Sequence, residues 1–238
     1  MKRYFQSKIL DLFFPGRCVV CDRPTDRQGI LLCSTCVPAI GYVKSPFCMK
    51  CGKKTEENEQ EYCKDCRSRN HRYIRAMSVY DYGSMADSIF RFKYAGRAEY
   101  AKFYGYDMFR QRGRWLLSLG AQALVPVPIH KSRQRKRGYN QAQLLAEALS
   151  VYAGIPVCDT LIARCGKTRP QKNLTDRERQ NNLKKAFKIL QNDVKLSTIV
   201  IIDDIYTTGS TIDAMCEILS SVGIRRIYCL TLAVGRGI

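Results

Sequence analysis

The residues from 198 to 211 read TIVIIDDIYTTGST, and they constrain the fold of this chain more than any other segment. A run of β-branched and apolar residues leads directly into two carboxylates, Asp203 and Asp204. A run that is apolar on both faces predicts a strand in the middle of a parallel sheet, where ligands bind at the carboxyl ends of the strands. A helical pattern follows the turn, at Ile212, Met215, Cys216 and Leu219. The segment therefore predicts a strand, a loop and a helix of an α/β protein.

The loop after the two acids has the composition of a phosphate site. Backbone N–H groups at a helix start, together with hydroxyls, suit a phosphate monoester. The two carboxylates repel phosphate, but they accept hydrogen bonds from sugar hydroxyls or hold a divalent cation. The segment thus predicts a 5-phosphoribosyl site. The alternative is a buried strand followed by an ordinary helix N-cap at Ser210 or Thr211, and a Walker A loop is excluded because no GK[ST] follows the glycine. The loop residues are Thr207, Thr208, Gly209, Ser210 and Thr211.

Eight of the twelve cysteines form four CxxC pairs, each beginning 15 residues after the previous one; we call this segment the cysteine ladder. Two such pairs bind one tetrahedral zinc ion, so four pairs predict two structural zinc sites. Sequential pairing would give two stacked zinc ribbons and interleaved pairing a cross-braced arrangement; loops of eleven residues favour the sequential form. Disulfides and a redox pair fit less well, because the chain shows no secretory signal and redox motifs come singly. The predicted ligands are Cys18, Cys21, Cys33, Cys36, Cys48, Cys51, Cys63 and Cys66.

The net charge of +19 favours a polyanionic partner, nucleic acid first, over a merely solvated basic surface. Two tetrathiolate zinc sites would lower this charge only to about +15. No run is as long as a membrane span, so no membrane insertion is expected. The first 18 residues have an interrupted apolar pattern that predicts a short amphipathic helix rather than a signal peptide. We therefore expect a cytoplasmic protein.

The composition changes near Asn70, which predicts two domains: 1–69, an N-terminal helix and double zinc ribbon, and 70–238, an α/β domain. Alternating strands and helices in the second part predict a parallel sheet with right-handed crossovers. The expected strands are 73–80, 123–128, 155–157, 161–163 and 226–234. One expected helix begins after Gly83 and reaches Tyr94, and the others are 99–112 and 141–152.

Two basic stretches, 130–141 and 164–182, stand out in the second part. The first follows a predicted strand, which puts its side chains on the same rim as the phosphoribosyl loop. Arginine suits bidentate phosphate contacts, although a solvated loop is the alternative for both stretches. Single strands bind to positive grooves with stacking aromatics, for which Tyr139 and Tyr94 are candidates unless they are core tyrosines. The predicted nucleic-acid contacts are Arg133, Arg135, Lys136, Arg137, Tyr139 and Lys93.

These motifs, in their order along the chain, resemble the ComF (ComFC) competence family. After the cysteine ladder come Phe92-Lys93-Tyr94 with Gly96 and Arg97, then VPVP, RGYNQA, TRPQKNL, ERQNN and finally DD–TTGST. The resemblance implies a type I phosphoribosyltransferase fold in which Asp203 and Asp204 take the ribose hydroxyls of PRPP and the loop takes its 5′-phosphate. It also implies a role in natural transformation, with single-stranded DNA bound in the cytoplasm and a DNA-uptake helicase as a possible partner.

Two functions stay open at this point. One is a DNA-uptake factor with a phosphoribosyl-binding site; the other is a Mg²⁺-dependent phosphoribosyltransferase of unknown acceptor. In an enzyme, His130 and Lys131 would lie where pyrophosphate is met, and residues 164–182 could close over the reaction. No segment suggests a hood that recognises a nucleobase. A scaffold recognised through its zinc ribbons is a third possibility.

Overall fold

The computed structural model describes residues 16–25, 29, 31–55, 60–166, 186–191 and 195–235. The expected N-terminal helix and most of the second basic stretch lie outside these ranges. Among the described helices, none is both long and apolar enough to cross a membrane.

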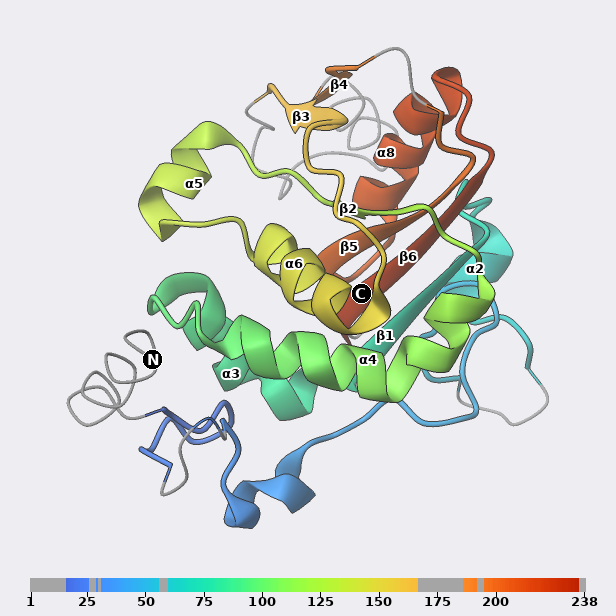
Figure 1. Ribbon diagram of the computed structural model, residues 1–238. Coiled ribbons are helices and arrows are strands. Elements are labelled where there is room, and N and C mark those ends of the chain that lie inside the picture. Colours follow the sequence, from blue (N-terminus) through green and yellow to red (C-terminus); the bar gives the residue numbers. More distant parts are fainter. Residues whose placement is uncertain are drawn as a thin grey trace.

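A parallel sheet of four strands forms the centre of the molecule (Figure 1). Its order is β1-β6-β5-β2, and every neighbouring pair is parallel. The first five residues of β5 are buried, as expected of a strand that is covered on both faces. The predicted α/β architecture is confirmed. The strands are β1 (Arg75–Asp81), β2 (Ala123–Pro126), β5 (Thr198–Tyr206) and β6 (Arg226–Val234).

Two hydrophobic cores lie on the two faces of this sheet. Alternate residues of β5 belong to different cores: Ile199 and Ile201 to one, Val200 and Ile202 to the other. The first core includes most of helix α8, and the second includes α3 and α4 with most of α6. Figure 1 shows α8 on one side of the sheet and the other three helices on the opposite side. The helices are α3 (Tyr82–Tyr94), α4 (Tyr100–Ser118), α6 (Gln141–Ala153) and α8 (Ser210–Ser221).

The first basic stretch is not a loop, because it contains the helix α5 (Lys131–Arg137). The His130 side chain accepts a hydrogen bond from the Ser132 N–H at its start, and Gly138 ends it with a φ of 85°. None of its residues is buried, so it has no apolar stripe that would reveal a helix in the sequence.

Two of the short strands also differ from the expectation. Residues 155–157 form no regular strand; Val157 makes a single parallel bridge to Leu124. The strand β3 (Ile162–Arg164) does not join the main sheet but pairs antiparallel with β4 (Phe187–Ile189), which the sequence did not predict. Helix α4 continues beyond Arg112 to Ser118.

Both edges of the sheet are covered by neighbouring chain. On the β1 edge, the Val43 N–H donates to the Val79 carbonyl at 2.9 Å and the Ala76 N–H donates to the Lys50 carbonyl at 2.7 Å. On the β2 edge, the Leu124 N–H donates to the Pro156 carbonyl at 2.9 Å. The cysteine ladder, with its short helices η1 (Ser34–Ala39) and α2 (Lys64–Ser68), thus protects an edge that would otherwise be free to pair. The domain boundary at residues 69 and 70 stays a prediction.

Candidate metal and ligand sites

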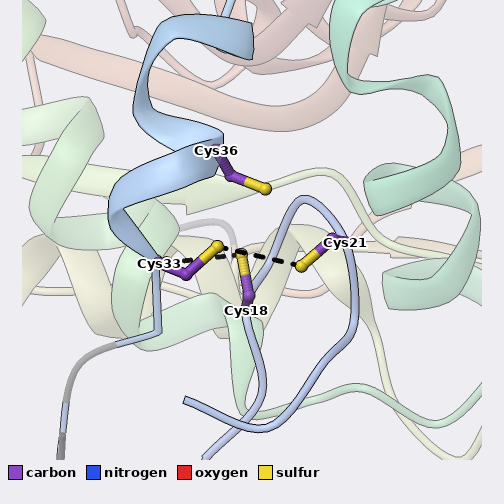
Figure 2. A group of neighbouring side chains, drawn as sticks. All are labelled: Cys18, Cys21, Cys33 and Cys36. Atoms are coloured by element: carbon purple, nitrogen blue, oxygen red, sulfur yellow. Dashed lines mark hydrogen bonds between the residues drawn. The ribbon is translucent and has the colours of Figure 1, made fainter. Parts of the chain in front are cut away.

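The eight cysteines of the ladder gather into two groups of four. The first is Cys18, Cys21, Cys33 and Cys36 (Figure 2), and the second is Cys48, Cys51, Cys63 and Cys66. Within each group the Sγ atoms all lie within 4.8 Å of one another. The Sγ–Sγ distance is 3.9 Å for Cys21–Cys33 and 3.6 Å for Cys51–Cys63. A tetrahedron with Zn–S bonds of about 2.3 Å has edges of about 3.8 Å. Each group therefore fits one structural zinc ion, and the sequential pairing is confirmed.

These two groups, the first and second zinc sites, are not stacked on each other as sequential ribbons were expected to be. The first site lies against α3 and α4: the Arg91 guanidinium donates to the Val20 carbonyl at 2.5 Å, and the Tyr100 hydroxyl donates to Asp22 Oδ1 at 2.6 Å. The second site packs into the core on the α8 side of the sheet. Figure 1 shows the chain that carries the first site, in blue, near α3 and the chain that carries the second near α2. The chain between them pairs along β1 through Val43, which holds the two sites apart.

The two acids at the end of β5 lie beside a lysine from α3. Lys93 Nζ lies 2.9 Å from Asp204 Oδ1, and these side chains are only 14% and 16% exposed. The Asp203 Oδ1 accepts a hydrogen bond from the Asp204 N–H at 2.8 Å. Burial and the neighbouring Asp204 carboxylate raise the pKa of Asp203 to about 7, although Lys93 and Arg164 act in the opposite direction. Near neutral pH, Asp203 can therefore both donate and accept hydrogen bonds.

Residues 207–211, the phosphate loop, lead from the acids into α8. The N-cap of this helix is Gly209, with a φ of 76°. The alternative, an ordinary N-cap at Ser210 or Thr211, is not observed. No side chain caps the first turn among the described residues, so its N–H groups point to the loop without a capping partner. The hydroxyls of Thr208 and Ser210 lie 2.9 Å apart. Such an N-terminus, next to hydroxyls, is suited to bind an anion.

Beneath the loop lie three buried residues that the sequence did not single out: His71, Tyr73 and Tyr206. A Cβ atom on Gly209 would lie 2.6 Å from the Tyr206 hydroxyl and 3.0 Å from His71 Cε1, so only glycine fits. His71 Nδ1 lies 2.7 Å from Asp213 Oδ2, and because a carboxylate can only accept, Nδ1 carries the hydrogen. No local signal could have revealed His71, since its partner is 142 residues away.

Some of the predicted nucleic-acid residues are exposed, whereas others contact neighbouring side chains. Arg133, Arg135 and Lys136 are exposed on α5. Arg137 lies over the Tyr94 ring, 4.7 Å from its centroid, and donates to the Tyr94 hydroxyl at 2.9 Å. Lys93 instead belongs to the acid pair.

The two candidate stacking tyrosines differ in their surroundings. Tyr94 is 56% exposed, and its ring centroid lies 5.2 Å from that of Phe90, which is 58% exposed. Tyr139, in contrast, packs partly buried against Phe92 and donates its hydroxyl to the Phe92 carbonyl at 2.5 Å. The surroundings of Tyr139 therefore favour the alternative of a core tyrosine, and Tyr94 is the better candidate for stacking.

Comparison with known families defines the class of this protein. Residues 9–67 match the family model of the double zinc ribbon domain, and residues 135–237 match that of the phosphoribosyl transferase domain. A solved adenine phosphoribosyltransferase from Thermoanaerobacter pseudethanolicus aligns with 54% of this chain and 78% of its own, at 16% identity and a TM-score of 0.33. Because this TM-score is low, the assignment rests on the family models and the parallel sheet. The protein is a double zinc ribbon joined to a phosphoribosyltransferase-like domain.

Several relatives match almost the whole chain. Competence protein F of Haemophilus influenzae is 30% identical over 228 residues, covering 93% of this chain and 98% of its own. The DNA utilization protein YhgH of Salmonella typhimurium is 30% identical over 92% of this chain and 98% of its own. Competence protein ComFC of Bacillus subtilis is 30% identical over 87% of this chain and 89% of its own. The chain belongs to the ComF (ComFC) family of competence proteins, as the order of its motifs predicted.

Proposed function

We propose that this protein handles single-stranded DNA during DNA uptake and binds a 5-phosphoribosyl ligand at a separate, neighbouring site. The names of its relatives, two competence proteins and a DNA utilization protein, support the first part. The acid pair beside a glycine-capped helix supports the second. This juxtaposition at the end of β5 is the single observation that carries the phosphoribosyl site.

The acid pair suits a sugar diol better than a bare metal ion. Asp204 is already paired with Lys93 at 2.9 Å, and the raised pKa of Asp203 leaves it partly protonated near pH 7. A half-protonated carboxyl pair can donate to and accept from two neighbouring hydroxyls. Mg²⁺ would then be held through the phosphates of PRPP rather than by dedicated protein ligands. The 5′-phosphate would lie on the N–H groups of the phosphate loop.

An internal nucleotide of DNA does not fit this acid pair. Deoxyribose lacks the 2′-hydroxyl, and its 3′-oxygen carries a phosphodiester whose charge the carboxylates repel. The DNA site is better placed on the arginine–aromatic surface, which we define as Phe90 and Tyr94 on α3 with Arg133, Arg135 and Lys136 on α5. Positive charge for the backbone beside exposed rings for the bases is the combination that holds single strands. The net charge of +19 favours the same partner.

Fluorescence anisotropy with labelled single-stranded DNA tests the DNA site. The double variant Arg133→Ala with Arg135→Ala should weaken binding. The matched control, Lys195→Ala with Arg225→Ala, should not weaken it. These two exposed basic residues come before β5 and β6, at the ends of the strands opposite to the proposed DNA surface. Equal weakening by both pairs would show that only overall charge matters and would contradict the proposed surface.

Calorimetry with PRPP and Mg²⁺ tests the phosphoribosyl site. Asp204→Asn should weaken PRPP binding and leave the affinity for DNA unchanged, because the two sites are distinct. A parallel loss of both affinities would mean that one site serves both ligands.

The second candidate function is an active Mg²⁺-dependent phosphoribosyltransferase, favoured by the same acid pair and loop. Release of pyrophosphate from PRPP in the presence of a panel of bases and amines would establish it. His130, which the sequence placed near the pyrophosphate, serves as the N-cap of α5. From the sequence we also propose a cytoplasmic location and two domains of residues 1–69 and 70–238. By family resemblance we propose a DNA-uptake helicase as partner.

A further inference from the structure

The phosphate loop begins at a buried tyrosine pair. Tyr206 is the last residue of β5 and is only 3% exposed. Its hydroxyl lies 2.6 Å from that of Tyr73, and the two rings meet edge to face with centroids 6.3 Å apart. The Tyr206 hydroxyl also occupies the space directly below Gly209. The position of this side chain therefore determines where the loop can run.

The second zinc site packs against the same tyrosine pair. Cys48 and Cys51 are fully buried in one core cluster with Tyr73 and Tyr206, and Cys63 and Cys66 pack against that cluster. Lys53, two residues after Cys51, places Nζ 5.8 Å from the centroid of the Tyr206 ring and is held there by Asp65 of α2 at 2.6 Å. The chain around this site thus lies directly beneath the start of the loop.

Close packing on β1 leaves the second zinc site no room to shift independently. Gly52 has a φ of 73°, and a Cβ atom there would lie 3.0 Å from the Ala76 carbonyl oxygen and 3.1 Å from Met77 Cα. The Ala76 N–H also donates to the Lys50 carbonyl at 2.7 Å. Displacement of the metal-bound chain would therefore move β1 and the residues that precede it.

A second connection runs from α2 to helix α8. His71 follows the end of α2 by three residues, is only 4% exposed, and stacks on Tyr73 with centroids 5.0 Å apart. Its Nδ1 donates to Asp213 Oδ2 at 2.7 Å, while Asp213 Oδ1 accepts from the Arg72 N–H at 2.8 Å. Asp213 lies in the first turn of α8, directly after the phosphate loop. Both ends of the loop are thus tied to chain that the second zinc site orders.

We infer that zinc at the second site positions the phosphate loop, and that zinc at the first site does not. Without zinc, four neighbouring thiols have no common partner, α2 is released, and His71 and Tyr73 lose the support that holds Tyr206 and Asp213. The loop N–H groups would then no longer converge on one phosphate. The first site instead contacts α3 and α4, through the side chains of Arg91 and Tyr100. This inference rests on the proposed function only where it takes the loop to bind phosphate.

Cys63→Ser and Cys21→Ser form a matched pair of variants, one for each zinc site. Native mass spectrometry should show the loss of one zinc ion in each. Hydrogen exchange of peptides covering residues 203–215 should become faster in Cys63→Ser and stay unchanged in Cys21→Ser. The affinity for ribose 5-phosphate, measured by calorimetry, should fall about tenfold in Cys63→Ser and less in Cys21→Ser. Equal effects of the two variants, or an unchanged loop in zinc-depleted Cys63→Ser, would overturn the inference.

If Cys63→Ser does not fold, a second pair of variants, each lacking one hydroxyl, tests the connection between Tyr206 and the phosphate loop. Tyr206→Phe removes only the hydroxyl below Gly209, so it should retain both zinc ions yet weaken ribose 5-phosphate binding and increase loop exchange. Tyr104→Phe removes an equally buried hydroxyl, bonded to Ser88 in the other core, and should change neither. Identical behaviour of these two variants would contradict the inference. If the wild-type protein does not bind ribose 5-phosphate, the proposed function fails, and the exchange measurement still tests the dependence of the loop on zinc.

Discussion

Asp203 is predicted to destabilise the folded protein at neutral and alkaline pH. Burial and the adjacent Asp204 raise its pKa from 3.8 to about 7. Between these two pH values the folded chain holds more protons than the unfolded chain, so the free energy of unfolding falls as pH rises through this window. Replacing Asp203 with Asn removes the charge but keeps an oxygen that can accept the Asp204 N–H. Asp203→Asn should therefore stabilise the protein, and more so at pH 8 than at pH 5.

The size of the effect follows from the shift in pKa. Each pH unit between the two pKa values corresponds to about 1.4 kcal/mol, so the full shift corresponds to about 4 kcal/mol above pH 7. Because part of this shift comes from interaction with the neighbouring Asp204 carboxylate, we assign about half of it, or about 2 kcal/mol, to Asp203 itself. At pH 5 the same reasoning leaves less than about 1 kcal/mol. For a chain of this size, about 2 kcal/mol raises the Tm by about 4–8 °C.

Thermal unfolding at pH 5, 6.5 and 8 measures this prediction. The control is Asp87→Asn, which changes an exposed carboxylate on α3 and should shift the Tm by no more than about 2 °C at any pH. The reasoning is refuted if Asp203→Asn lowers the Tm at pH 8, or if its effect is the same at pH 5 and pH 8. Asp203→Asn should also bind ribose 5-phosphate more weakly, because the carboxyl that destabilises the fold is the group proposed to bind the sugar hydroxyls.

Three further predictions concern the DNA surface and the loop. Arg133→Ala with Arg135→Ala should reduce the slope of log affinity for single-stranded DNA against log salt concentration by about 1.4, measured by anisotropy over a salt series. Tyr94→Ala should weaken that binding by about 1–3 kcal/mol, whereas Tyr139→Phe should leave it unchanged and lower the free energy of unfolding by about 1 kcal/mol in urea titrations. Gly209→Ala should cost at least about 1–2 kcal/mol of stability through its positive φ alone, and it should abolish ribose 5-phosphate binding by displacing Tyr206; normal binding by this variant would show that the loop tolerates a side chain.

The site could be predicted wherever its parts are consecutive in the chain. Asp203, Asp204, the glycine turn and the helix start follow one another, so their geometry is set locally by a strand that ends and a helix that begins. Zinc ligation was predictable for the same reason, because the spacing of cysteines defines each pair. The length of the loops between the pairs predicted that neighbouring pairs share a zinc ion, and the structure shows this sequential pairing.

The missed features depend on contacts between distant segments or on elements without an apolar face. In the sequence, Lys93 is one more basic residue, and only the packing of α3 on the sheet brings it to Asp204. The seven residues of α5 contain no apolar side chain, so periodicity could not reveal the helix, although His130 and Gly138 are recognisable start and stop signals. Tyr139 follows a run of arginines, and the sequence left open whether it stacks on bases or packs in the core, because its burial depends on the whole fold.

The order of strands in the sheet has a consequence for how the protein is made. β6 joins β1 to β5 in space, but it is the last of the four strands along the chain. On the ribosome, β1, β2 and β5 therefore emerge before the neighbour that unites them. The two zinc sites close over short loops and can form early, whereas the sheet must wait for residues 226–234. Metal loading would then precede assembly of the ligand site, which forms in one late step when β6 inserts.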